Sequence, residues 1–234
     1  MKRIVLTSST AAVTNPSRDP NEPYTYTSED WNPLTYEDAL SANNAPTAYR
    51  ASKKLGELEA WNWARSPSSV NANGEKIDLT VFCPPLVIGP WVHPVENLSS
   101  VNASNQVIKD MVLGVTKDST AAKRTSAWID VRDLALAHVE AAYIRPETSN
   151  KRFIACSPEE LNYQLVAQII KKEFPARAEK VALPPGGPPS SHIVFDGSPL
   201  TKEVGVKYTA LRMCIVAMVK KIQDEAVKEG LLEL

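Results

Sequence analysis

The stretch Ala48-Tyr49-Arg50-Ala51-Ser52-Lys53-Lys54 opens a run from Thr47 to Ser66 in which apolar residues recur at helical spacing. This spacing predicts a long helix, and the Thr47 hydroxyl is a suitable N-cap. Tyr49 and Lys53 are four residues apart, so a helix places them on one face, about one turn from each other. A neighbouring cation lowers the pKa of a phenol from its ordinary value of about 10. The pair is therefore a candidate proton donor, although many helices carry a Tyr and a Lys at this spacing by chance.

The first residues of the chain combine an apolar run with a cluster of hydroxyl groups. Ile4-Val5-Leu6 is typical of a buried strand, and Thr7-Ser8-Ser9 follows it directly. A second buried strand is predicted over 77–82, and Pro84 ends it because proline cannot donate to a central ladder. Chemistry in open α/β sheets gathers at the carboxyl ends of the strands. We therefore expect Ser9 to join the tyrosine and lysine of the following helix in a proton-donating triad.

Four motifs occur in an order that resembles a known family. They are Thr7-Ser8-Ser9, Tyr49-x-x-x-Lys53, Pro84-Pro85-Leu86-Val87-Ile88-Gly89-Pro90 and Trp128-Ile129-Asp130-Val131-Arg132-Asp133. Together they resemble the extended short-chain dehydrogenase/reductases of the NAD-dependent epimerase/dehydratase type. With Trp31-Asn32-Pro33, they are most similar to the fungal aldehyde and ketone reductases related to dihydroflavonol and cinnamoyl-CoA reductases. The resemblance runs from residue 1 to about residue 208.

The resemblance implies an α/β fold with a Rossmann-type parallel sheet that lacks its N-terminal glycine-rich half. A smaller C-terminal substrate lobe would complete the fold. We expect one NAD(P)-binding-like domain over residues 1–234, with a partial Rossmann core over about 1–90. The substrate lobe and the elements that return to the core would occupy about 91–234.

The resemblance also implies an activity, namely reversible hydride transfer between a nicotinamide cofactor and the CH–OH group of a small alcohol, or the matching aldehyde or ketone. In the family's mechanism Tyr49 would give a proton to the carbonyl oxygen. Lys53 would lower the pKa of Tyr49 and hold the nicotinamide ribose, and Ser9 would align the carbonyl. The cofactor would be NADP or NAD, and the resemblance favours NADP.

Three further residues take cofactor-binding positions by resemblance. The backbone at Pro84 and Val87 would contact the nicotinamide carboxamide, and Ser104 would approach the cofactor. Cys83 stands where the family often has Asn or Arg, which weakens that part of the correspondence. A proline-rich strand exit that serves packing alone is the alternative interpretation of this segment.

The glycines of the chain depart from the family pattern. No subset of the nine fits G-x-G-x-x-G or G-x-x-G-x-x-G, the turn that lets the backbone approach a pyrophosphate. We therefore expect the chain to be truncated at its amino end by on the order of 100 residues, at about 30 residues per βαβ unit. The same gap predicts weak dinucleotide binding by the chain as given.

Composition narrows the class of protein further. A formal net charge of −1 gives no reason to expect nucleic acid or an anionic membrane as a partner. Three widely spaced cysteines, with no signal peptide and no long apolar run, are typical of a reduced cytoplasmic protein. No metal-ligand spacing occurs, and helix capping accounts for Asp130 and Asp133. We expect His138 to be a structural residue.

The rest of the chain predicts a long loop over 11–46 and helices over 131–144, 159–174 and 211–227. Two rival functions stay open. A sugar-nucleotide epimerase or hydroxysteroid dehydrogenase of the same superfamily uses the same Tyr and Lys. A truncated, catalytically impaired homologue would act as a non-enzymatic binding module, and the missing glycine motif favours that reading.

Overall fold

The computed structural model describes residues 1–115, 125–182 and 192–232 of the chain. It divides into two compact units. The first unit comprises Met1–Pro85, Asp133–Pro158 and Ser191–Lys207, and the second comprises Leu86–Arg132, Glu159–Ser190 and Tyr208–Leu234. The organisation as one domain over 1–234 stays a prediction.

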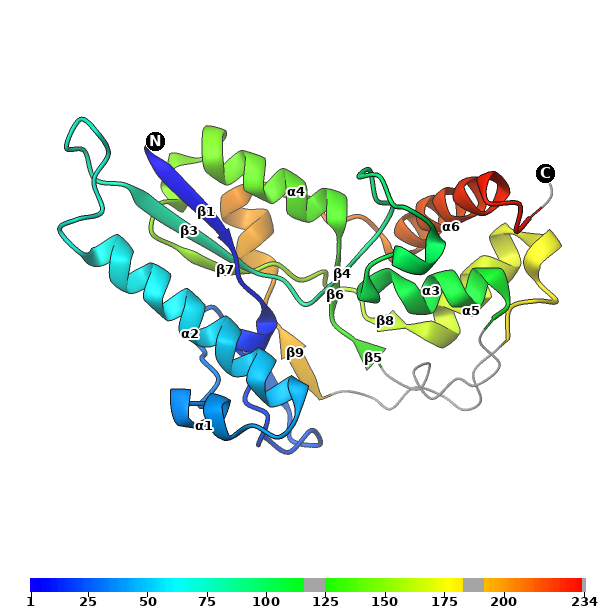
Figure 1. The fold of residues 1–234 in the computed structure, drawn as a ribbon, viewed down its shortest axis with the longest axis horizontal. Coiled ribbons are helices and arrows are strands. Elements are labelled where there is room, and N and C mark those ends of the chain that lie inside the picture. The colour runs from blue at the N-terminus through cyan, green and yellow to red at the C-terminus, as the bar shows by residue number, and fades with distance from the viewer. Residues whose placement is uncertain (116–124, 183–191, 233–234) are drawn as a thin grey trace. The chain divides into compact units, whose positions relative to one another are not determined.

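A parallel three-stranded sheet forms the centre of the first unit (Figure 1). Its order is β1 (Arg3–Thr7), β3 (Asp78–Cys83) and β7 (Arg152–Ile154). The register places Thr7 opposite Phe82, and Cys83 opposite Ile154, so the carboxyl ends of the strands lie at one edge. Both strands predicted from apolar runs are confirmed, and so is the parallel α/β fold class.

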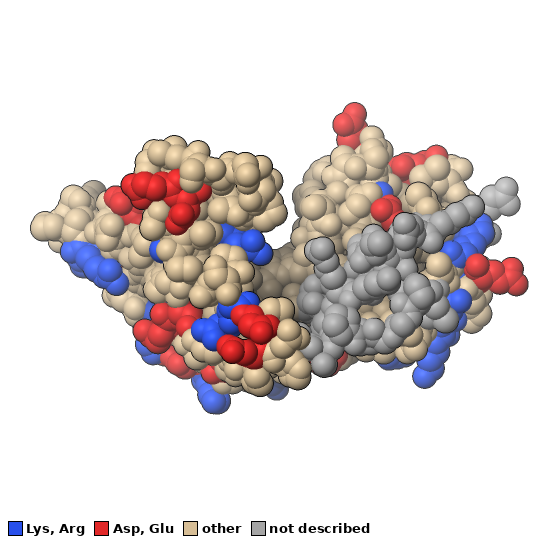
Figure 2. Space-filling model, turned by 90° about the horizontal axis from the view of Figure 1, so that it is seen from below, with Lys and Arg blue, Asp and Glu red and all other residues tan. Residues whose placement is uncertain are grey.

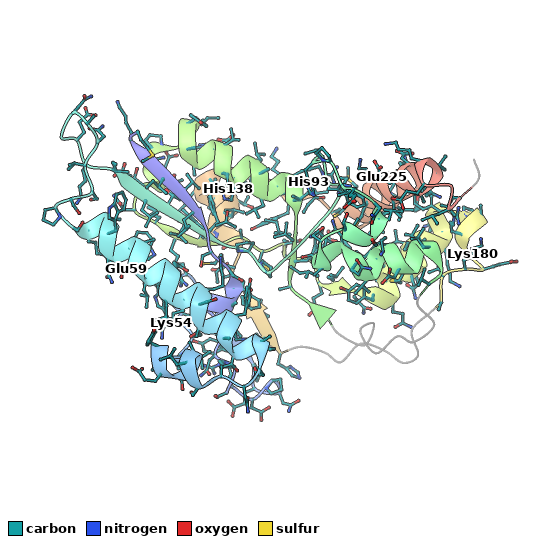
Figure 3. All side chains as sticks on the ribbon, in the orientation of Figure 1. Lys54, Glu59, His93, His138, Lys180 and Glu225 are labelled. Carbon is teal, nitrogen blue, oxygen red and sulfur yellow. The ribbon has the colours of Figure 1, made fainter. Side chains whose placement is uncertain are left out.

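Two helices cover opposite faces of this sheet, α2 (Ala45–Arg65) and α4 (Val131–Val139). The Cys83 thiol contacts Glu57 of α2, whereas the ring of the preceding residue, Phe82, lies 5.1 Å from the ring of His138 in α4. Successive residues of a strand point to opposite faces, so the two contacts lie on different sides of the sheet. Figure 3 labels His138 on α4.

The start of α2 differs from the prediction. Asn44, not Thr47, is the N-cap, because the Asn44 side chain accepts a hydrogen bond from the Thr47 backbone N–H at 2.9 Å. Pro46 therefore lies inside the first turn. A proline is well tolerated there because the first N–H groups of a helix have no intrahelical partner.

The segment predicted as one long loop, 11–46, contains regular structure. It includes most of the 3-10 turn η1 (Thr10–Ala12), the strand β2 (Tyr24–Tyr26) and the helix α1 (Tyr36–Ser41). Thr35 and Asp38 form a capping box at the start of α1. The β2 strand pairs in parallel with β9 (Ile193–Phe195), far away in the sequence. The prediction of one long loop was wrong in that it missed these elements, because they are too short to show a periodic pattern.

Glu57 is a charged residue in the interior of the first unit. Its carboxylate accepts hydrogen bonds from the Ser8 hydroxyl, from the Trp61 indole N–H at 3.2 Å and from the Arg152 guanidinium at 2.7 Å. The side chains of Glu57 and Arg152 are 1% and 7% exposed. Besides Trp61 of its own helix, the carboxylate contacts Ser8 just after β1, Cys83 of β3 and Arg152 of β7, so it links α2 to all three strands of the sheet.

Arg152 extends the network to the segment before α1. Its Nη1 donates to the backbone carbonyls of Ser28 and Asp30 at 2.7 and 2.6 Å. The guanidinium also lies over the indole of Trp31, 3.8 Å from the ring centre. The ion pair is thus surrounded by hydrogen bonds, the condition under which a buried pair is tolerated.

The described residues of the second unit form two small sheets and three helices, besides short helical turns. Strands β4 (Leu86–Ile88) and β6 (Trp128–Asp130) pair in parallel, and β5 (Thr125–Ser126) pairs antiparallel with β8 (Leu161–Asn162). The helices are α3 (Ala103–Leu113), α5 (Tyr163–Glu173) and α6 (Leu211–Lys228). Because residues 161–162 form β8, α5 begins later than the predicted residue 159, and Asn162 caps it. The core of this unit contains Trp91, Ile108, Trp128, Ile170 and Met218.

Short helical turns complete the two units. They are η2 (Leu98–Ser100), the π-helical turn η4 (Glu140–Ile144), η5 (Pro146–Thr148), η6 (Pro175–Arg177) and the π-helical turn η7 (Leu200–Val204). The predicted helix over 131–144 is therefore α4 continued by η4. Figure 2 shows acidic and basic side chains on both units. None of the helices in the described ranges is long and apolar enough to cross a membrane.

We predict that Glu57→Ala lowers the free energy of unfolding by about 3–5 kcal/mol, because Arg152 then keeps a buried charge without its carboxylate. Denaturant unfolding followed by circular dichroism measures the change. Glu59→Ala is the matched control, since Glu59 is an exposed carboxylate on the same helix (Figure 3) and should cost less than about 0.5 kcal/mol. Equal effects of the two substitutions would contradict the role of the ion pair.

Candidate active site

Ser9 lies at the carboxyl end of β1, where the chain turns into η1. It is the N-cap of that turn, and its Oγ accepts a hydrogen bond from the Ala11 backbone N–H at 3.1 Å. The residue is 9% exposed, and η1 packs against α2. The sequence therefore places this hydroxyl at the strand end that the fold class predicts, beside the tyrosine helix.

Lys53 is anchored at the same strand end. Its Nζ donates a hydrogen bond to the backbone carbonyl of Thr7 at 3.2 Å, two residues before Ser9. Tyr49 lies one turn earlier on α2 and is 55% exposed. Within the described part of the chain its hydroxyl has no hydrogen-bond partner. The structure thus brings Lys53 and Ser9 to the end of β1, with an accessible phenol on the adjacent turn of the helix.

The neighbouring lysine has a different contact. Lys54 Nζ donates to the backbone carbonyl of Leu34 at 2.6 Å and so ties α2 to the segment before α1. Figure 3 labels Lys54 on this helix. The two lysines point to different partners because consecutive residues on a helix are about 100° apart.

Asn32 holds η1 and α2 together and was not singled out as a site residue from the sequence. Its Nδ2 donates to the backbone carbonyls of Ala11 at 2.7 Å and Arg50 at 3.0 Å. Its Oδ1 accepts from the Leu34 N–H, and its own N–H donates to the Ala12 carbonyl. Asn32 is 1% exposed, so these hydrogen bonds are shielded from solvent. The only sequence signal was its place in Trp31-Asn32-Pro33.

His138 contacts the end of β1 from the other face of the sheet. Its Nδ1 lies 2.8 Å from the Leu134 carbonyl, which can only accept, so Nδ1 carries the proton. In the neutral ring Nε2 then accepts from the Thr7 hydroxyl at 2.7 Å. This arrangement agrees with the structural role expected for His138.

Pro84 lies beside the Ser9 turn. The Pro84 carbonyl accepts from the Thr10 N–H at 2.9 Å, and the Phe82 carbonyl accepts from the Ser8 N–H at 2.7 Å. The exits of β1 and β3 are therefore held together by backbone hydrogen bonds. Between them Cys83 is buried, and burial raises the pKa of its thiol to about 12.

Val87 and Ser104 belong to the second unit. Val87 is in β4 opposite Ile129, and Ser104 is in the first turn of α3. The side chain of Asn105 bonds both the N–H and the carbonyl of Gly89, at 3.2 and 3.1 Å. Gly89 has a φ of +135°, and a Cβ there would come within 3.0 Å of the Val131 side chain. Glycine is thus required at this turn.

Asp130 has the capping role expected from the sequence. Its Oδ1 accepts from the Arg132 backbone N–H at 2.8 Å, and its carboxylate pairs with the Arg132 guanidinium at 2.6 Å. Burial alone would raise the pKa of Asp130, but the hydrogen bonds from Arg132 hold it below its ordinary value. Among the described residues, no group of three or more His, Cys, Asp or Glu side chains is arranged to hold a metal ion.

Comparisons with known proteins place these features among fungal oxidoreductases. The chain is 36% identical over 227 residues to an uncharacterised oxidoreductase of Schizosaccharomyces pombe, covering 97% of this chain and 64% of that protein. It is 36% identical over 191 residues to a protein of Candida albicans described as an NADPH-dependent methylglyoxal reductase, covering 80% of this chain and 51% of that protein. No family model matches the chain.

A solved structure gives the same result at the level of the fold. Yeast methylglyoxal/isovaleraldehyde reductase in complex with NADPH superposes with a TM-score of 0.77 at 27% identity, covering 99% of this chain and 65% of that one. The chain thus spans between about half and two thirds of the length of these relatives, namely 51%, 64% and 65%. It is homologous to fungal oxidoreductases, and the epimerase/dehydratase type of short-chain dehydrogenase/reductase fits both its sequence and its fold.

We predict that Cys83 does not react with iodoacetamide in the folded protein between about pH 7 and 9. The thiolate is the reactive form, and burial holds the pKa near 12, so almost none is present. Above about pH 9 the thiol ionises in the unfolded chain but not in the folded one. The contribution of Cys83 to the free energy of unfolding therefore falls as the pH rises. Mass spectrometry should find the Cys83 peptide labelled only after denaturation. Rapid native labelling at pH 8 would contradict the burial.

Proposed function

Starting from this homology, we propose that the chain carries the proton-transfer groups of an NADPH-dependent carbonyl reductase. Its substrate would be a small aldehyde or ketone such as methylglyoxal, the compound in the name of the Candida albicans relative. One observation carries the proposal. Lys53 is bonded to the carbonyl at the end of β1, two residues before Ser9, and an accessible Tyr49 stands one turn away on the same helix.

Each of the three residues has a distinct role in this proposal. Tyr49 gives its phenolic proton to the substrate carbonyl oxygen as a general acid. Lys53 favours the phenolate that remains and binds the ribose next to the nicotinamide. Ser9 donates a hydrogen bond to the same carbonyl oxygen and fixes its direction. NADPH, when bound, supplies the hydride.

The residues present fit the nicotinamide end of the cofactor better than its pyrophosphate. A pyrophosphate site needs a glycine turn between a strand and a helix N-terminus. After β1 the chain enters the three-residue turn η1, and after β3 it enters Pro84-Pro85, and neither turn contains glycine. Further binding groups are therefore needed for tight cofactor binding. The same fact supports a non-enzymatic binding module as the second candidate.

The fold alone does not distinguish among the substrates of this superfamily, so the substrate is part of the proposal. If the chain were a sugar-nucleotide epimerase or a hydroxysteroid dehydrogenase, Tyr49 and Lys53 would serve it equally well. The segment Trp31-Asn32-Pro33 favours the aldehyde and ketone reductases instead. A cytoplasmic location is part of the proposal as well.

The first test uses Tyr49→Phe in a chimera. A segment of on the order of 100 residues, which opens with a strand, a glycine-rich turn and a helix, is joined ahead of Met1 to complete the fold. NADPH oxidation with methylglyoxal is then followed at 340 nm. We expect the phenylalanine variant to lose about 10²–10⁴-fold in kcat, because general acid catalysis is removed, while NADPH affinity is unchanged. The unmodified chain, assayed in parallel, should bind NADPH weakly. Near wild-type turnover by the phenylalanine variant would refute the assignment of Tyr49.

The second test compares two adjacent lysines. We expect Lys53→Ala to reduce both NADPH affinity and kcat of the chimera, since only Lys53 reaches the end of β1. Lys54→Ala removes the same charge from the next position and should leave both quantities within about twofold, because Lys54 bonds the Leu34 carbonyl instead. Equal losses for the two variants would show that charge, not position, matters.

A further inference from the structure

We propose that a cavity in the first unit binds a small aromatic carboxylate. The cavity has a volume of about 510 Å³ and lies among α2, β7 and the segment 28–31. Binding pockets for small molecules commonly have volumes of about 300–1,000 Å³. None of Ser9, Tyr49 and Lys53 lines this cavity, so the site is separate from the proposed catalytic groups.

The walls of the cavity are partly aromatic, with Trp31 half-buried and Trp61 and Phe153 only 7% and 2% exposed. Leu58, Trp61 and Arg65 lie at positions i, i+3 and i+7 of α2 and therefore share one helical face. Trp31 and Phe153 line the cavity from other elements. Indole and phenyl rings pack well against another planar ring, which favours an aromatic ligand.

Both indoles are held in place by the protein itself. The Trp61 indole N–H donates to Glu57 at 3.2 Å, and the Trp31 ring lies under the Arg152 guanidinium at 3.8 Å. Arg152 is fixed in turn, since four of its five N–H groups are used by Glu57 and by two backbone carbonyls. A ligand therefore meets walls that are already ordered, which lowers the entropic cost of binding.

The charges on the lining leave one cation available. Arg152 is paired with Glu57, and Lys151 is paired with Glu203 at 2.7 Å. Arg65 is exposed, its guanidinium lies 5.7 Å from the Trp61 ring centre, and no described carboxylate pairs with it. A guanidinium binds a carboxylate through two parallel N–H···O bonds. Arg65 is thus the group that would hold the acid of a ligand whose ring packs on the indoles.

A second charge on the lining limits the ligand to one negative charge. Glu29 lines the cavity, and in the described structure its carboxylate has only the Ser28 hydroxyl, at 3.4 Å, as a partner. Its charge repels a doubly charged phosphate ester more strongly than a carboxylate. A planar aromatic monocarboxylate therefore satisfies the shape and the charge of the cavity together.

Isothermal titration of the full chain with indole-3-acetate, and with the isosteric neutral indole-3-acetamide, tests the proposal. We expect the acetate to bind with a dissociation constant on the order of 0.1–1 mM and the amide about tenfold more weakly. In the Arg65→Gln variant, indole-3-acetate should bind about as weakly as indole-3-acetamide binds to the unaltered chain. Glu29→Gln should tighten acetate binding about twofold, since it removes a repulsive charge.

Two controls separate this site from others. Lys220→Gln removes an exposed cation from α6 and should not change either titration. Lys53→Ala should not change them either, which also makes the result independent of the proposed reductase function. Equal affinity for acetate and amide, an unaltered Arg65→Gln variant, or loss of binding in Lys53→Ala would each overturn the proposal.

Discussion

The ion pair between Glu57 and Arg152 is the constraint on which the first unit depends. Two buried charges cost several kcal/mol each in lost hydration, and only a complete set of partners offsets that cost. Here the partners come from β1, α2, β7 and the segment 28–31, so these elements must meet in one arrangement for the charges to be satisfied. The helix that carries Tyr49 and Lys53 is held against the sheet by the Glu57 carboxylate, about two turns after Tyr49.

The parts of the fold that were predicted correctly are those with a strong local pattern. The apolar runs predicted β1 and β3, and helical periodicity predicted α2, α5 and α6. The missed elements, β2 and α1, are short, and β2 exists because a distant segment, β9, pairs with it. The cap of α2 was misplaced by three residues because Thr47 and Asn44 both carry suitable capping side chains, and the first turn of the helix accommodates Pro46 between them.

The candidate site was predictable to a similar extent. Strand ends and helical spacing predicted Ser9 and Lys53 near the exit of β1, where both lie in the structure, whereas their catalytic roles stay a proposal. Asn32 could not be identified as a site residue in this way, because it acts by donating to the backbone carbonyls of Ala11 and Arg50, which come near it only on folding. The burial of Cys83, which raises the pKa of its thiol, likewise results from the packing of the sheet and cannot be inferred from the neighbouring residues in the sequence.

The pairing of β2 with β9 has a consequence for how the protein is made. Tyr26 is fully enclosed and stacks on Phe195 at 5.3 Å, a contact between residues synthesised far apart in time. Arg152 likewise reaches Glu57 across 95 residues. At about 5–20 residues per second of translation, the emerging chain holds β1 and α2 for several seconds before their partners exist. The first unit can therefore complete its packing only after β9 has left the ribosome, so it should fold late rather than progressively.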